Sequence, residues 1–385
     1  MSHSPSATHL KFFTPGVWVM LVFMFMGAVA VVARFTWGIG SVANLDNSHP
    51  WGIWVGIDVA TGVALAAGGF TTSFLAHIIG RHHYEPIVRP ALLTAMLGYT
   101  FVVLGLLVDI GRTWAIWKPI FNWNTNSALF EVAMCVLVYL HVLYFEFAPT
   151  VGEGIGGRVK TFITAVTDKI MWIFIILGVV LSCMHQSSLG TLMLIAPTKL
   201  HPLWYTPLLP LLFLSSAIAV GFPMVVFETT LVSSSLKLDS EMKILTPLTK
   251  ITIFTLGLYM VLKVGDLFYR DVLGYLLDGS TQSNSFLVEL GFGVILPWLL
   301  LITPGVRKSR GMLFFACCLI VGGVVLNRIN VFLVGYHSPY AQTSYFPSIG
   351  EIAVTAGLIA TLMFIYRLAV TFLPVLSASK QEVSA

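Results

Sequence analysis

Charged residues are scarce in this chain of 385 residues. Asp, Glu, Lys and Arg together make up only 10% of it, whereas 57% is hydrophobic and the mean hydropathy is +0.89. Soluble domains carry about 25% charged residues, so this composition excludes an ordinary soluble protein. The chain also lacks a long polar region that would fold separately from the apolar runs. We therefore predict a single polytopic membrane domain over residues 1–385.

Cysteine is also rare. The four cysteines lie in apolar stretches and lack the CxxC spacing that holds zinc or an iron–sulfur cluster. They are better explained as small buried hydrophobic residues. The 21 Lys and Arg residues exceed the 17 Asp and Glu residues only slightly and lie mostly between apolar runs. We expect no metal site, no iron–sulfur cluster of its own, and no nucleic-acid partner.

Long apolar runs fill most of the chain. A run such as "VWVMLVFMFMGAVAVV" does not alternate between apolar and polar residues as a membrane β-strand does, so it favours a helix. Runs of about 20 such residues are long enough to span a bilayer. We predict an all-α integral membrane protein with ten transmembrane helices, at Pro15–Ala33, Trp51–Ile79, Ala91–Ile110, Ala128–Ala148, Ile170–Met184, Leu208–Leu231, Ile251–Phe268, Phe286–Ile302, Met312–Leu326 and Ile349–Leu373.

The distribution of Lys and Arg predicts the orientation. Ten spans put both termini on one side of the membrane, and Lys and Arg are enriched in cytoplasmic loops. The side of the termini holds fourteen of these residues. The other side holds seven: Arg34, Arg112, Lys118, Lys199, Lys263, Arg270 and Arg328. We predict that the short tails, residues 1–14 and 374–385, are both cytoplasmic.

Several ionisable residues lie inside the predicted spans. Such residues are expensive in a bilayer and are candidates for a functional role. A first group falls in the outer half of the membrane: Asp58, Asp109, Arg112, Glu131, His185, Asp266, Arg270 and Glu289. A second group lies deeper or towards the cytoplasm: His77, Tyr99, His141, Glu146, Glu228 and Lys263. This layout is typical of a polar site near the outer face with a partial chain of protonatable groups leading inward.

Some of these residues also have ordinary structural explanations. Asp109 and Arg112 are spaced i, i+3, and Asp266 and Arg270 are spaced i, i+4, so each pair is also consistent with an ion pair on one helix face. A lone His141 on an apolar helix is more often a hydrogen-bonded residue than a ligand. Such explanations leave a role in a site open.

Glu131 and Glu228 are harder to explain structurally. Each lies in an apolar run with no opposite charge within four residues. Just before Glu131, Ser127 is placed to cap the fourth predicted helix at its N-terminus. The adjacent Gly68 and Gly69 indicate close helix packing or an irregular backbone in the second span.

The stretch "MHQSSLG", residues 184–190, is predicted to close the fifth span at the outer face. Its polar residues are consistent with a simple helix terminus. Together with Asp58 and Glu131, however, His185 and Gln186 supply the donors and protonatable groups that a quinone headgroup requires. The same side chains are suited to a transported cation or solute.

Haem is a weaker alternative. Dihaem membrane proteins hold iron between pairs of helical histidines. Only His77, His141 and His185 lie in or at the ends of spans. His77 and His141 are the one pair that can share a depth, so a single haem is left open.

A set of motifs resembles a known family. They are, in order, "PWGIWVGIDVATG", "RPALLTAMLGYT", "VDIGRTW", "NSALFEVAMC", "MHQSSLGTLM", "HPLW", "VFETTLV", "YRDVL" and "YFPSIGE", between about residues 50 and 351. They resemble the membrane subunits of the NrfD/polysulfide-reductase family. Within it they are similar to the HybB type of hydrogenase complexes and to the HmcC type of a high-molecular-weight cytochrome complex.

The resemblance implies a helical subunit of a respiratory complex in the bacterial inner (cytoplasmic) membrane, with no haem or iron–sulfur cluster of its own. Such subunits bind menaquinone or ubiquinone and build two four-helix bundles plus additional helices. A periplasmic ferredoxin-like iron–sulfur subunit docks on the outer face. A nickel–iron hydrogenase or a multihaem cytochrome c exchanges electrons with it, and other membrane subunits are compatible with this arrangement.

The resemblance also assigns residues. His185, Gln186, Glu131 and Asp58 correspond to parts of an outer quinone pocket, with Asp109 and Arg112 beside them as supports. Among these, His185, Glu131 and Asp58 are the candidate catalytic residues. The intramembrane positions Tyr99 and Glu228, with His141, form the candidate proton path.

Two further functions are consistent with the residues alone. In the first, the chain is a structural anchor whose polar residues serve helix packing. In the second, it is an ion or solute transporter. A His185→Ala variant that assembles and still reacts with quinone at the normal rate would favour the anchor. Unaided transport in vesicles by the purified chain would favour the transporter.

Overall fold

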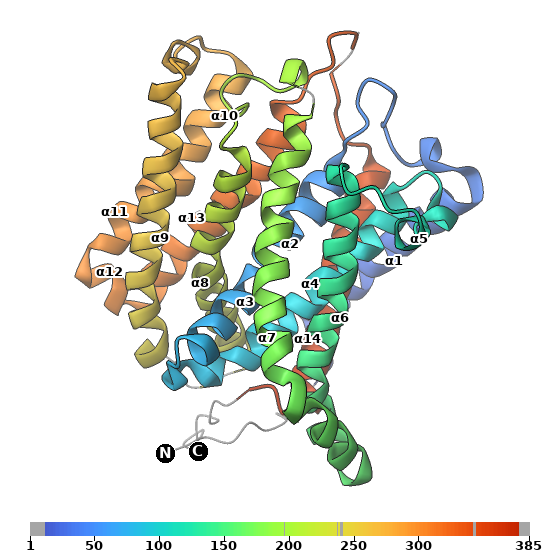
Figure 1. Ribbon diagram of the computed structural model, residues 1–385, viewed down its shortest axis with the longest axis vertical. Helices are drawn as coiled ribbons and strands as arrows, with labels where there is room; N and C mark the ends of the chain where they lie inside the picture. Colours follow the sequence, from blue (N-terminus) through green and yellow to red (C-terminus); the bar gives the residue numbers. More distant parts are fainter. Residues whose placement is uncertain (1–11, 196, 237, 239–241, 342–343, 377–385) are drawn as a thin grey trace.

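The fold is that of a computed structural model, which describes residues 12–195, 197–236, 238, 242–341 and 344–376. Within these residues, ten helices are long and apolar enough to cross a membrane, as the sequence predicted (Figure 1). They are Pro15–Trp37, Trp54–Ile78, His82–Asp109, Ala128–Ile155, Lys169–Leu194, Leu209–Leu236, Met242–Tyr269, Thr281–Ile302, Arg310–Val334 and Ile349–Phe372. The predicted cytoplasmic tails lie mostly outside the described residues.

The second to fifth spans form a first four-helix bundle. The second span contains α2 (Gly62–Leu65) and α3 (Ala67–Ser73), and the next three are the long helices α4 (Glu85–Asp109), α6 (Ala128–Ile155) and α7 (Gly157–Leu194). The second span packs on α4, α4 on α6 and α6 on α7, while α3 also touches α7. These contacts close the bundle.

The sixth to ninth spans form a second bundle. Its helices are α8 (Leu209–Leu236), α9 (Met242–Tyr269), α10 (Thr281–Leu290) with α11 (Leu296–Ile302), and α13 (Arg310–Ile329). α8 packs on α9 and α13, and α3 packs on α8, so the two bundles meet along the second span. The predicted arrangement of two bundles with additional helices is confirmed.

The two additional helices are α1 (Pro15–Trp37) and α14 (Ile349–Phe372), which pair with each other, and α14 lies against α4 (Figure 1). At their crossing a Cβ on Gly27 would approach the Gly357 Cα to 2.8 Å. Small residues allow backbones to approach this closely in a bilayer. α1 starts and α14 ends at one end of the molecule, which we call the inner end; the opposite end is the outer end.

Small residues also fix the second span, as its two glycines predicted. A Cβ on Gly69 would meet the Ala95 Cβ of α4 at 2.5 Å, and one on Gly68 would meet the Gly221 carbonyl of α8 at 3.3 Å. The same span contains two π-helical turns, Trp54–Thr61 and Phe74–Ile78. π-turns often lie at functional sites, and the first contains Asp58.

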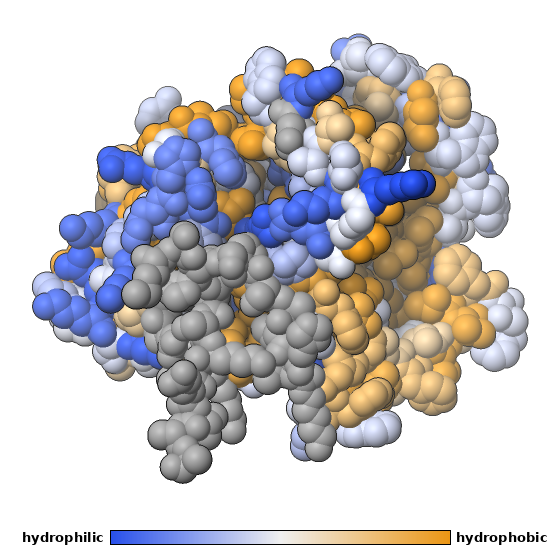
Figure 2. Space-filling model, turned by 90° about the horizontal axis from the view of Figure 1, so that it is seen from below, coloured by the Kyte–Doolittle hydropathy of each residue, from blue (hydrophilic) through white to orange (hydrophobic). Residues whose placement is uncertain are grey.

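The outside of the molecule is suited to lipid. Large apolar side chains such as Phe25 of α1, which is 70% exposed, and Phe254 of α9, also 70% exposed, point away from the interior. Figure 2 looks onto the inner end, where hydrophilic residues gather on the face and hydrophobic residues form much of the flank. This division is what an integral membrane protein requires.

The prediction that the fifth span ends at Met184 is wrong. α7 continues to Leu194, so residues 184–190 lie inside the helix. The Ser187 hydroxyl donates to the Met184 carbonyl at 2.9 Å and the Thr191 hydroxyl to the Ser187 carbonyl at 3.2 Å. Because these hydroxyls are satisfied within the helix, a polar stretch did not require the helix to stop.

Candidate functional site

A large cavity lies where α1 and α14 cover the junction of the two bundles. Its volume is about 580 Å³, and residues of the second span, α4, α8, α14 and α1 line it. Most of the lining is apolar, including Leu65, Phe101, Met224 and Leu362. Ligand sites of this kind are mostly apolar, with a few polar groups that orient the ligand.

Asp58 is the acidic group at the outer part of this cavity. The Thr355 hydroxyl of α14 donates to the Asp58 Oδ2 at 2.8 Å. Asp109, at the end of α4, lies close enough to act on Asp58 electrostatically. The structure therefore brings together Asp58 and Asp109, which are 51 positions apart in the sequence.

Arg34, which the sequence placed only in an outer loop region, is part of this outer polar group. Its side chain is 5% exposed and donates to the Val108 carbonyl at 2.7 Å and the Ile110 carbonyl at 2.7 Å. Both carbonyls are at the C-terminal end of α4, where a helix favours a cation. Arg34 also acts electrostatically on Asp109, whose Oδ1 is buried without a hydrogen-bond partner.

The alternative of an Asp109–Arg112 ion pair on one helix face is not realised. α4 ends at Asp109, so the helical i, i+3 spacing is lost, and Arg112 is exposed in the loop that follows. Arg34 is the cation near Asp109 instead. By contrast, the Asp266–Arg270 pair at the C-terminal end of α9 is present at 2.7 Å.

Glu351 completes the outer group and was missed in the sequence, although the motif "YFPSIGE" contains it. It is fully buried, accepts from the backbone N–H of Ser348 at 2.9 Å in a capping box and accepts from the Tyr345 hydroxyl at 2.5 Å. Burial raises the pKa of the Tyr345 phenol well above its ordinary value, so this hydroxyl stays a donor. Glu351 in turn acts electrostatically on Asp109.

Glu228 is the acidic group at the inner part of the cavity. It accepts a hydrogen bond from the Tyr366 hydroxyl of α14 at 2.6 Å, and both residues line the cavity. The cavity thus has a carboxylate near each end and apolar walls between them. Such an interior is suited to an amphipathic molecule with a long apolar part.

His185 lies inside the first bundle, and it is not among the residues that line the cavity. It is fully buried, its Nδ1 is 3.0 Å from the Tyr99 hydroxyl, and its Nε2 has no hydrogen-bond partner among the described residues. The neighbouring Gln186 donates to the Val63 carbonyl of the second span at 2.8 Å. Val63 follows Gly62, a lining residue, so these side chains lie behind the cavity wall.

Glu131 is also inside the first bundle. It is in the first turn of α6, where the helix favours a carboxylate, and it accepts from the Ser188 hydroxyl at 2.5 Å. The predicted N-cap is confirmed, because the Ser127 hydroxyl accepts from the Phe130 N–H at 3.3 Å. Glu131 therefore contacts α7, the helix that carries His185, whereas Asp58 faces the cavity.

His141 is not brought to the other predicted proton-path residues. Its side chain is exposed on the outside of α6, and its Nδ1 lies 2.7 Å from the Leu137 carbonyl of the same helix. Tyr99, in contrast, is fully buried against Tyr139 and His185. Of the three residues, Tyr99 and Glu228 are enclosed and His141 is not.

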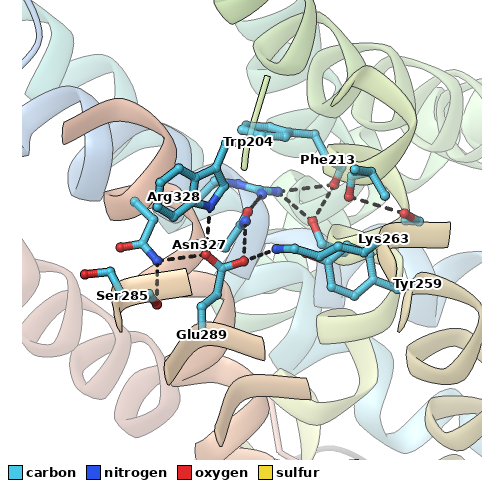
Figure 3. Close-up of polar contacts among 12 residues, drawn as sticks. Trp204, Phe213, Tyr259, Lys263, Ser285, Glu289, Asn327 and Arg328 are labelled. Carbon is cyan, nitrogen blue, oxygen red and sulfur yellow. Dashed lines mark hydrogen bonds and ion pairs between the residues drawn. The ribbon is translucent and has the colours of Figure 1, made fainter. Parts of the chain in front are cut away.

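A second buried polar group lies in the second bundle (Figure 3). Lys263 of α9 pairs with Glu289 of α10, and the sequence singled out both without predicting that they pair. Arg328 of α13, counted in the sequence as an outer-side residue, is fully buried beside them. In the sequence, these three residues could be recognised only as charges inside apolar runs. Such a charge does not reveal which residue it pairs with.

Comparison with known proteins decides the family. Residues 41–339 match the family model described as "Polysulphide reductase, NrfD". The chain belongs to the NrfD family. The predicted membership, including its likeness to hydrogenase membrane subunits, is thereby confirmed.

Two named relatives of this NrfD-family chain cover almost all of its length, and a third covers less. This chain is 33% identical to the "Probable Ni/Fe-hydrogenase 2 b-type cytochrome subunit" of Escherichia coli K12, over 99% of this chain and 97% of that protein. It is 27% identical to the "Menaquinone reductase, integral membrane subunit" of Nitratidesulfovibrio vulgaris, over 93% and 91%. It is also 27% identical to "Protein NrfD" of Escherichia coli K12, over 63% and 81%.

The name of the hydrogenase relative raises the question of haem. Histidine is a common axial ligand of haem iron, and the residues that line the 580 Å³ cavity include no histidine. His185, on α7, is fully buried against Tyr99 of α4, and His141 is exposed on the outside. The lining of this NrfD-family cavity therefore does not fit a haem.

Proposed function

We propose that this protein is the quinone-reactive membrane subunit of a respiratory oxidoreductase complex. It exchanges electrons between a partner at its outer end and menaquinone or ubiquinone in the bilayer. The observation that carries the proposal is the apolar cavity of about 580 Å³ with Asp58 at its outer part. That volume is within the range of roughly 300–1,000 Å³ typical of ligand sites. The printed names of the menaquinone reductase and hydrogenase relatives support it.

The headgroup of the quinone would lie beside Asp58. Quinone reduction consumes two electrons and two protons, so a protonatable side chain must reach the headgroup oxygen. Thr355 orients the Asp58 carboxylate, and Asp109 with Arg34 sets the charge around it. The isoprenoid tail would follow the apolar walls towards Leu236 at the inner part of the cavity.

Electrons would enter from the outer end. Asp58 is the fifth residue of its span, which corresponds to a depth of about 6 Å along a helix. A headgroup at that depth is close to a redox centre docked on the outer surface. We propose a periplasmic ferredoxin-like iron–sulfur subunit as this partner, with a nickel–iron hydrogenase or a multihaem cytochrome c behind it.

Protons would be carried by the enclosed groups on either side of the cavity wall. Glu228 and Tyr366 reach the inner part of the cavity, while Tyr99 and His185 lie behind the wall in the first bundle. We propose Glu228 and Tyr99 as members of an inward route, with Gln186 and Glu131 as supports of His185. The exposed His141 would act only at the lipid-facing surface.

The proposed topology follows from the same arrangement. The described chain starts and ends at the inner end, where Arg367 Nε donates to the Phe12 carbonyl at 3.1 Å. Three of the seven outer-side cations counted in the sequence, Arg34, Lys263 and Arg328, are buried, so even fewer remain for the outer surface. We propose a single membrane domain in the bacterial inner membrane with both termini in the cytoplasm.

The first test is a substitution that fills the cavity and leaves its polar side chains unchanged. Leu362→Trp places an indole into the cavity, whereas Leu368→Trp on the same helix places one on the 42% exposed lipid-facing side. In the isolated complex, we expect quinone-linked turnover to fall at least tenfold for Leu362→Trp only. Equal turnover in the two variants, with intact assembly, would leave a structural anchor as the better explanation.

A second pair of variants tests the carboxylate. Asp58→Asn keeps the size of the side chain and removes its ability to carry a proton, and Asp278→Asn makes the same change in an exposed loop. General acid–base groups contribute roughly 10²- to 10⁴-fold, so we expect a loss of at least about 10²-fold for Asp58→Asn. A loss of less than about threefold would show that Asp58 does not protonate the quinone.

A further inference from the structure

The second bundle contains a charged group that has no part in the cavity. The Glu289 carboxylate is fully enclosed and has partners on both oxygens (Figure 3). Oε1 is paired with the Lys263 ammonium and accepts from the Asn327 amide at 2.8 Å. Oε2 accepts from the Trp204 indole at 3.1 Å and from the Asn330 amide at 2.8 Å.

The charges of this group do not cancel. Arg328 is fully buried, but its guanidinium bonds only neutral groups: it donates to the Asn327 Oδ1 at 2.5 Å, the Ser216 hydroxyl at 3.0 Å and the Phe213 carbonyl at 3.2 Å. Two cations therefore surround one carboxylate. Enclosing unbalanced charge in a bilayer is costly, and such residues are rarely retained only for packing.

Polar residues of α9 lead from this group to the outer end. Tyr259, Lys263, Asp266 and Arg270 are spaced four, three and four residues apart, so they follow one face of the helix. The Lys263 ammonium donates to the Tyr259 hydroxyl at 3.2 Å, and Asp266 pairs with Arg270 at 2.7 Å. The Arg270 side chain is 15% exposed, so the row reaches the surface.

Small cavities lie on both sides of the ion pair. One, of about 10 Å³, is lined by Lys263, Asp266 and Tyr259 on the outer side. A second of about 10 Å³ is lined by Glu289, Tyr259 and Gly293. A polar cavity of this size is sufficient for about one water molecule. The first cavity, which has Thr206, Lys263 and Asp266 in its lining, therefore has room for a water molecule beside Lys263, whereas the lining of the second is mostly apolar.

We propose that Lys263 and Glu289 form a proton-loading site in the second bundle, which exchanges protons with the outer end through Asp266. The Lys263 ammonium passes a proton to the Glu289 oxygen that it contacts, which converts the carboxylate to the neutral acid, and Lys263 regains a proton through the outer cavity, which it lines together with Asp266. Lys263 then loses its counter-ion, and its flexible ammonium turns within the cavity towards Asp266. No electron moves, and release of the proton reverses the step.

The titratable groups that face Glu289 are Lys263 and Tyr259 from α9 and Arg328 from α13. Asp266 and Arg270 follow further out. The structural alternative is that the group only holds the four helices together. The two explanations differ in one respect: only a loading site changes its protonation in the folded protein.

Infrared difference spectroscopy on the purified full chain tests the proposal without quinone, so its failure is separate from failure of the quinone site. After a downward pH jump, we expect a carboxylic-acid band that is lost in Glu289→Gln. Lys263→Met should raise the pH midpoint of that band by at least about one unit, because a cation within about 6 Å favours the ionised form. Lys250→Met, the same change at an exposed position of α9, should not.

The outer route has its own test. In Asp266→Asn the same band should rise at least tenfold more slowly after the pH jump, with an unchanged midpoint. A band that survives in Glu289→Gln overturns the loading site. If Glu289→Gln does not fold, a Lys263→Met midpoint equal to that of Lys250→Met overturns it equally. An unchanged rate in Asp266→Asn overturns the outer route.

Discussion

Arg34 allows the strongest stability prediction, because one side chain ties α1 to the end of α4. In Arg34→Met the two short bonds to the Val108 and Ile110 carbonyls are lost, and the longer one to Thr113 at 3.3 Å adds little. A hydrogen bond to a charged group contributes about 1.5–3 kcal/mol. The site is near the outer interface, where water reaches the freed carbonyls, so the lower value applies. Two bonds then correspond to about 3 kcal/mol.

The assay can use the four free cysteines, of which Cys135 and Cys317 are buried in different bundles. Their reaction with a thiol dye reports unfolding in mixed micelles with rising SDS content. We expect Arg34→Met to lower the free energy of unfolding by about 3 kcal/mol relative to Arg81→Met, which changes an exposed loop residue. Arg34→Lys should recover part of the loss. A difference below about 1 kcal/mol would refute the reasoning.

Three further results are expected. Glu228→Gln should slow quinone-linked turnover while the complex still assembles, since it removes the protonatable group beside Tyr366; unchanged turnover would exclude it from the proton route. His185→Ala should lower turnover while the variant still assembles with its partners; a normal rate would favour the anchor function. Gly357→Val should lower the free energy of unfolding by about 1–3 kcal/mol in the SDS assay, because a Cβ there would lie 2.7 Å from the Gly27 Cα. An unaffected variant would mean that α1 and α14 are not held in this close crossing.

The ten spans could be predicted because each depends on one local property, the length of an apolar run. Features with a local sequence signal could also be predicted. The Ser127 cap, the Asp266–Arg270 pair and the close packing at Gly68 and Gly69 are all present. The end of the fifth span could not be predicted in the same way. Polar composition suggested a terminus at residue 184, whereas the hydroxyls of Ser187 and Thr191 bond within a continuing helix.

The site itself depends on contacts between distant segments. The cavity forms only where five spans meet, and no single run encodes its volume. Asp58 and His185 were expected in one pocket because both lie in the outer half of the membrane, yet a helix wall separates them. The depth of a residue in the membrane can be read from its position in a span. The direction in which its side chain points depends on tertiary packing, which the sequence does not show. The same holds for the unpredicted pairing of Lys263 with Glu289.

Photolabelling with a menaquinone analogue that carries a diazirine on its ring tests the central claim most directly. In membranes that contain the assembled complex, we expect the label on cavity-lining residues near Asp58, such as Leu358 of α14 and Ile57 of the second span. Leu362→Trp should abolish this labelling and Leu368→Trp should not. Labelling that is instead confined to the interior of the first bundle around His185, or that is unaffected by Leu362→Trp, would contradict a quinone site in this cavity.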